Sequence, residues 1–206
     1  LRLEFDGSVQ LLFRGSAISS DGGLLLHREL DDALGLTDLA TDLLVDHRTG
    51  KNGRHTFVGL LRQSIFSRLA GYEDVNDADR LCRDPVMRQL VGGRAVKRGA
   101  ASASAMGRFE TATLTQAENL AALADLSGHW IDAVHAKRPS KVIGLDMDSS
   151  ESPVYGDQEG AIWNGHFQSK CLHPLFVFNQ FGDLERCVLR PGNVHSADGW
   201  KELLSP

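Results

Sequence analysis

The sequence predicts an α+β fold in which a helical N-terminal region is followed by a strand, a β-hairpin and the start of a helix. Two observations predict it: helical periodicity dominates residues 1–138, and short apolar runs bounded by turn residues dominate residues 139–206. A length of 206 residues suits one sizeable domain or two small ones. We therefore predict a mainly helical region, 1–138, and an incomplete α/β region, 139–206.

The first two expected helices are separated by a glycine. Ser20 or Asp21 is the predicted cap of a helix over residues 24–34, because both side chains accept hydrogen bonds from free backbone N–H groups. Gly35 is expected to end this helix, and Thr37 to cap the next one.

Two longer helices follow. Apolar residues at i, i+3 and i+4 predict a helix over Phe57–Leu69, with Gly71 as its stop signal. Thr115 and Glu118 have the spacing of a capping box and predict a long helix that ends near Ala136.

A basic segment lies between these helices, although the whole chain has a formal net charge of −5. Residues 80–108 contain seven basic side chains and a single acid, Asp84. Such a cluster is typical of phosphate contacts or of a solvated face. Arg94, Lys97 and Arg98 are the candidate DNA-binding residues, and the small residues around them, 92–107, predict a flexible connector.

Several classes of protein are excluded by what the composition lacks. No run approaches the roughly 20 apolar residues of a membrane helix, and the first residues do not resemble a signal peptide. Cys82, Cys171 and Cys187 are odd in number and widely spaced, which predicts reduced thiols. A folded cytoplasmic protein without membrane contact is expected.

The second region has three strand signals. An apolar run over residues 141–148 ends in two acids, and two further runs, 172–179 and 184–190, flank a Gly-Asp turn and predict a hairpin. Ser196 or Asp198 is the predicted cap of a short final helix.

Asp146 and Asp148 are the candidate catalytic and metal-binding residues. They are separated by one residue of a strand, so both side chains leave the same face, about 7 Å apart. Two carboxylates this close favour a hard cation such as Mg²⁺ between them, although a strand-end cap is the structural alternative. Other functional candidates, each with a structural alternative, are His195, Lys170, Arg190, Trp163 and Phe167.

Three enzyme classes use this acid pattern: haloacid-dehalogenase-type phosphatases, glycosyltransferases, and ribonuclease-H-like nucleases and transposases. The phosphatase needs a lysine and further acids well downstream, but only 58 residues follow Asp148. An Asp-x-Asp phosphatase is therefore a minor alternative.

Longer motifs resemble the group-1 DDE-domain transposases of bacterial insertion sequences (insertion-sequence family 1380). The resemblance covers nearly the whole chain. It is carried in the second region by residues 145–160, 164–167, 173–178 and 189–195, and in the first by residues 20–23, 69–74, 76–78 and 83–86.

The resemblance implies a ribonuclease-H-like catalytic domain that uses Mg²⁺ or Mn²⁺ to cut and join DNA. Asp148 is the first choice for the first catalytic acid, because Asp148-Ser149-Ser150 aligns with the related Asp-x-Thr form, and Asp146 is its partner or replacement. The family also needs a second Asp and a Glu on later elements, which predicts a fragment or a truncated copy without a complete triad. The implied partners are double-stranded DNA at transposon ends and further copies of the chain, and the helical region 1–138 is expected to bind DNA or mediate dimerisation. The alternative is a non-catalytic DNA-binding or subunit-interaction protein derived from a transposase.

Overall fold

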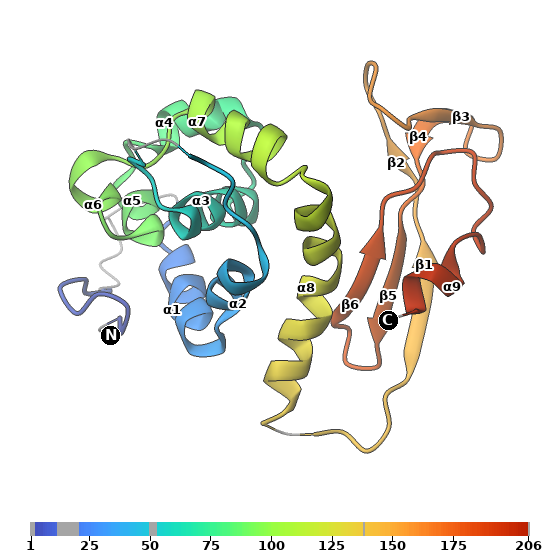
Figure 1. Cartoon of the computed structure of the whole chain (residues 1–206), viewed down its shortest axis with the longest axis horizontal. Helices are drawn as coiled ribbons and strands as arrows, with labels where there is room; N and C mark the ends of the chain where they lie inside the picture. Colours follow the sequence, from blue (N-terminus) through green and yellow to red (C-terminus); the bar gives the residue numbers. More distant parts are fainter. Residues whose placement is uncertain (1–2, 12–20, 50–52, 138, 206) are drawn as a thin grey trace. The chain divides into compact units, whose positions relative to one another are not determined.

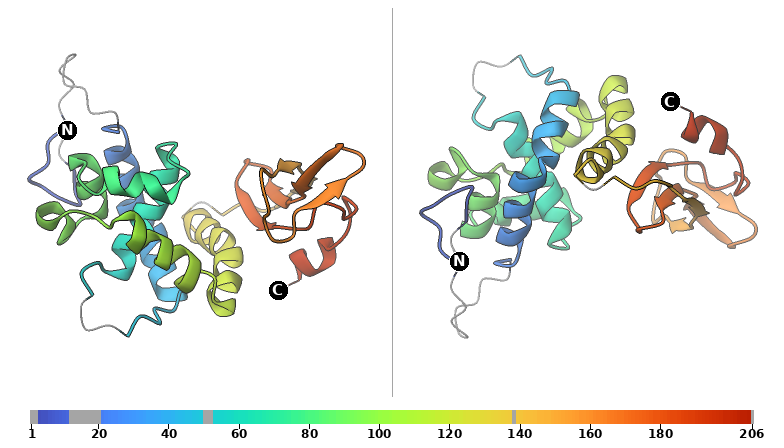
Figure 2. Two further views of the ribbon diagram at one scale, coloured as in Figure 1. Left: turned by 90° about the horizontal axis from the view of Figure 1, so that it is seen from above. Right: turned by 90° about the horizontal axis from the view of Figure 1, so that it is seen from below.

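The computed structural model describes residues 3–11, 21–49, 53–137 and 139–205, and its contacts divide the chain into two units, Leu1–Ala122 and Leu123–Pro206 (Figure 1). The described part of the first unit is helical, and all described strands lie in the second (Figure 2). The predicted α+β class is confirmed. The change in composition at residue 139 falls just after helix α8, whereas the contacts divide the chain inside that helix.

The helical unit consists of short helices that begin and end close to one another. Their bounds are α1 (Leu24–Leu34), α2 (Leu36–Leu43), α3 (Phe57–Leu69), the 3-10 turn η1 (Val75–Asp77), α4 (Ala78–Leu81), α5 (Pro85–Val91), α6 (Ala95–Arg98), α7 (Ala103–Arg108), the π-helical turn η2 (Phe109–Thr113) and the first part of α8 (Ala117–His135).

Gly35 separates α1 from α2, as predicted, and it has the positive φ of 74° that ends a helix without strain. The predicted caps at Asp21 and Thr37 are wrong. No side chain among the described residues caps α1, and Ser20 lies outside those residues. Thr37 lies in the first turn of α2, where its N–H and hydroxyl donate to the buried Asp31 carboxylate at 2.8 and 2.6 Å. The Asp31 carboxylate is therefore satisfied from the following helix.

Helix α3 has the predicted bounds and runs through the unit. The Thr56 hydroxyl accepts from the Gly59 N–H at its start, and its apolar face packs on α5. The core around Phe66 is made by Leu3, Leu24, Leu25, Leu81, Val86, Met87, Leu90, Val91, Ala95 and Ala100.

The predicted flexible connector, residues 92–107, is wrong, because this segment forms α6 and α7. It is held by a side chain far away in sequence: the fully buried Gln63 amide accepts from the Ala101 N–H and donates to the Ala101 carbonyl, both at 2.7 Å. Ala100, Ala101 and Met106 of this segment are buried.

Helix α8 is confirmed, but its capping box is not, since the Thr115 hydroxyl donates to the Thr111 carbonyl. Within the first unit the buried Asn119 on α8 accepts from the Val45 N–H at 2.7 Å and donates to the carbonyls of Val45 and Thr113. This amide fixes the segment that follows α2.

The second unit contains two small antiparallel sheets. One has the order β1 (Leu145–Ser149), β5 (Leu175–Asn179), β6 (Leu184–Val188); the other has the order β2 (Ser152–Pro153), β4 (Ser169–Leu172), β3 (Ile162–Asn164). The predicted hairpin is β5–β6. The second sheet was not predicted, because its strands are too short to show alternation.

The larger sheet has one covered face. Leu175, Val177 and Asn179 are buried, and the α8 residues of this unit lie over β6, where Ser127 donates to the Glu185 carbonyl and Asp125 pairs with Arg186 at 2.9 Å. Helix α9 (Trp200–Leu204) follows, with Gly199 at its N-cap, so the predicted Ser196 or Asp198 cap is wrong. None of the helices in the described part of the chain is long and apolar enough to cross a membrane.

Candidate metal centre and nucleic-acid interface

Asp146 and Asp148 lie on β1 with exposed side chains. Their cross-strand partners on β5 are Phe178 and Phe176, so both acids share the face opposite to the buried Val177. Strand β1 pairs only with β5 among the described strands, which makes it an edge. The strand therefore presents both carboxylates at an edge of the sheet, as the alternation of the sequence predicts.

These carboxylates are poorly compensated. Neither pairs with a cation within the described residues, and Asp148 Oδ1 accepts a hydrogen bond from the Ser149 N–H at 2.8 Å. Like charges this close are stabilised by a cation between them. The free oxygens suit Mg²⁺ or Mn²⁺, which take hard oxygen ligands.

The donor set is small. No group of three or more His, Cys, Asp and Glu side chains with the spacing of a metal site occurs in the described ranges. The pair accordingly fits part of a metal centre, with water or other groups as the remaining ligands.

The basic segment divides into structural and exposed side chains. Arg88 is partly buried and donates to the carbonyls of Ala95 and Val96, which ties α5 to α6. Arg80 lies over the Tyr72 ring, 4.8 Å from its centroid. Within this segment, five exposed basic side chains pair with no carboxylate among the described residues: Arg83, Arg94, Lys97, Arg98 and Arg108.

Helix α6 brings Arg94, Lys97 and Arg98 into one turn of chain. Ala95 of this turn is buried, whereas the three cations flanking it are exposed. The predicted DNA-binding residues thus lie together on an ordered element, although the sequence had indicated a flexible one.

The remaining candidates lie in the second unit, where most have structural partners. Arg190 is buried and donates to the carbonyls of His173, His195, Ser196 and Asp198. Burial lowers the pKa of Arg190, although the nearby Asp198 opposes this effect. The backbone around His195 is thereby fixed.

Three further candidates are Lys170, Trp163 and Phe167. Lys170 pairs with Asp157 at 2.8 Å, and this hydrogen bond lowers the pKa of the Asp157 carboxyl. Trp163 is 61% exposed, so its ring is not part of a core. Phe167 packs edge-on against the ring of the buried His173.

A second basic surface, around Arg48, Arg54 and His55, was not predicted. The signal that could have found it is the basic spacing of residues 47–55, which contain two arginines, two histidines and a lysine. This stretch is shorter than the basic segment at 80–108, and an acid, Asp46, directly precedes it.

Comparison with curated proteins and with solved structures found no match. A family model described as transposase DDE domain, group 1, matches residues 1–206. In this chain a strand with two exposed acids follows a helical region with exposed basic side chains. The family model covers the whole sequence, and the chain belongs to the group-1 DDE-domain transposase family.

Proposed function

We propose that this chain acts on DNA in transposition, and that β1 supplies the first carboxylates of a metal-dependent centre that cuts and joins phosphodiesters. The observation that carries the proposal is the exposure of Asp146 and Asp148 on one face of an edge strand without a described cationic partner. The strand order β1-β5-β6 supports a ribonuclease-H-like start of the domain. The motifs in residues 145–195 support insertion-sequence family 1380 as the narrower group, and a DNA substrate supports the bacterial cytoplasm as the compartment.

In this proposal Asp148 holds a Mg²⁺ or Mn²⁺ ion, with Asp146 as its partner. When bound, such ions activate the attacking oxygen and stabilise the leaving oxygen of a phosphodiester. The Ser149 N–H fixes one oxygen of Asp148, which leaves the other oxygen free for the cation. Asp148 is thus oriented by its own strand.

Calorimetric titration of the intact chain with Mn²⁺ tests the assignment. Two carboxylates leave most of the coordination shell to water, so we expect weak binding, with a Kd of roughly 10⁻⁴ to 10⁻³ M, that is lost in the Asp146→Asn, Asp148→Asn double variant. Glu159→Gln, which removes an exposed acid from another part of the unit, is the matched control and should bind like the parent chain.

Two results would contradict the assignment. Equal binding by the parent chain and the double variant would show that the acids on β1 do not hold the ion. Submicromolar binding abolished by Asp148→Ala would show that the site has more ligands than this pair.

We further propose that the α6 cations, Arg94, Lys97 and Arg98, contact DNA phosphates. Replacing all three with Ala should reduce the slope of log K against log salt for duplex binding by about 0.9 per lost contact, because each neutralised phosphate releases counterions. Fluorescence anisotropy with a labelled duplex at several salt concentrations measures this slope. An unchanged slope would assign α6 to a solvated surface.

A second candidate function is non-catalytic DNA binding or subunit interaction. The small donor set at β1 favours it. Salt-dependent binding to duplex DNA without any metal binding at β1 is the result that would select it.

A further inference from the structure

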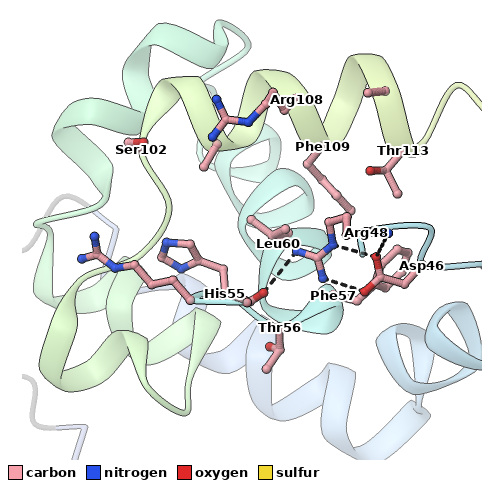
Figure 3. A pocket seen from close by; sticks show the side chains of 14 residues that line it. Asp46, Arg48, His55, Thr56, Phe57, Leu60, Ser102, Arg108, Phe109 and Thr113 are labelled. Atoms are coloured by element: carbon pink, nitrogen blue, oxygen red, sulfur yellow. Dashed lines mark hydrogen bonds and ion pairs between the residues drawn. The ribbon is translucent and has the colours of Figure 1, made fainter. Parts of the chain in front are cut away.

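The helical unit contains a cavity of about 870 Å³ that the sequence did not predict. It lies between the segment before α3, the start of α3, and helices α7 and η2 (Figure 3). The rings of Phe57 and Phe109, 5.5 Å apart and edge to face, line it together with Leu60. Arg54 and His55, from the segment before α3, and Arg108, at the end of α7, also line it.

The charge of the cavity is positive and only partly compensated. Arg48 is neutralised by Asp46, to which it donates from Nε and Nη2, both at 2.7 Å. The other arginines donate to neutral acceptors instead: Arg54 to the Arg98 carbonyl and Arg108 to the Ser104 hydroxyl, each at 2.7 Å. Neither has a carboxylate partner in the described ranges, and each guanidinium keeps further N–H donors free.

His55 lies among these charges and has a pKa below its ordinary value. Burial is the main cause, and the positive charges of Arg54 and Arg48 add to it. The charged groups that line its surroundings are Arg48, Arg54 and Arg108, with Asp46 as the acid. An anion in the cavity would offset the repulsion and raise this pKa.

The aromatic residues do not offer a surface for a base. Phe57 and Phe109 are buried, they contact each other, and the Arg48 guanidinium lies over the Phe57 ring, 5.9 Å from its centroid. Stacking on a base requires a free ring face. The accessible chemistry is instead that of guanidinium and imidazole N–H groups, which suits a phosphate.

We propose that Arg54, His55 and Arg108 form a pocket for a backbone phosphate of duplex DNA. Arg54 also joins the pocket to α6 through the Arg98 carbonyl, so that the pocket continues the surface of Arg94, Lys97 and Arg98. The inference rests in part on the proposed DNA-binding function, to which it adds a defined phosphate site.

Anisotropy with a labelled duplex tests the pocket through Arg108→Gln, with Arg83→Gln as the matched control, since both arginines are exposed and both changes remove one charge. Arg108→Gln should lower the salt slope by about 0.9 and Arg83→Gln should leave it unchanged. Arg54→Gln is the second pocket variant and should lower it similarly. Equal slopes for Arg108→Gln, Arg54→Gln and the parent chain would overturn the inference.

NMR of the His55 ring distinguishes the source of the phosphate. Duplex DNA should raise the pKa of His55 in the parent chain and not in Arg108→Gln. Inorganic phosphate, used as the probe, should raise the pKa of His55 only weakly, because it makes fewer contacts with the protein than duplex DNA does. A shift with inorganic phosphate but none with the duplex would overturn the assignment to DNA, as would no shift with either.

The two proposals fail separately. If the Arg94, Lys97 and Arg98 variant has a lower salt slope while Arg108→Gln and Arg54→Gln behave like the parent chain, the pocket inference fails and the proposed DNA binding stands. If the parent chain does not bind duplex DNA at all, the proposed DNA binding itself fails.

Discussion

Gly192 occupies a position that a larger residue cannot enter without moving the backbone. A Cβ at this residue would lie 2.2 Å from the Cys171 carbonyl oxygen and 2.4 Å from that of Ile162. The Gly192 carbonyl also accepts from the Asn164 side chain at 2.6 Å. Gly192 therefore lets the segment after β6 approach strands β3 and β4.

Gly192→Ala should destabilise the second unit by about 2 kcal/mol, because two fixed carbonyls must shift to accept the methyl group. Gly165→Ala is the matched control, since a Cβ there meets nothing within 4 Å. Tryptophan fluorescence during urea unfolding measures the difference, because Trp130, Trp163 and Trp200, the three tryptophans of the chain, all belong to this unit. Equal midpoints for the two variants would contradict the close approach.

Individual residues could be predicted from sequence where their role depends on their neighbours along the chain. Asp146 and Asp148 share a face because alternation in a strand is local. The role of Arg88 was not predictable, since its acceptors lie seven and eight residues further on, across a turn. A list of charges does not show which of them already have partners.

Helices and strands, like single residues, could be predicted where the signals that define them are local in sequence. Helix α3 was predicted to the residue, because its periodicity, its first turn and the glycine after it are all local signals. Helices α6 and α7 have four and six residues, too few for a periodic pattern, and Gln63 holds the loop between them from another helix. Long-range hydrogen bonds override a composition that is typical of a connector.

The second sheet was missed for a related reason. Strands of two to four residues carry almost no alternation. The outer strands of this sheet, β2 and β3, are each defined by their pairing with the central strand, β4.

The whole molecule combines two kinds of surface on one chain. The helical unit presents exposed cations on α6 and around the cavity, whereas β1 of the other unit presents two acids. A formal net charge of −5 conceals this segregation. Uneven charge of this kind suits a protein that binds a polyanion in one place and a cation in another.

If β1 holds a divalent cation, Mn²⁺ bound there should broaden nearby NMR signals through its paramagnetism. In two-dimensional NMR spectra of the intact chain, substoichiometric Mn²⁺ should broaden the amide signals of residues 145–149 and of Phe176 and Phe178 first, because these lie beside the acids. The Asp146→Asn, Asp148→Asn double variant should lose this effect, while Glu159→Gln keeps it. Broadening that is no stronger at β1 than elsewhere, or that persists in the double variant, would contradict the account.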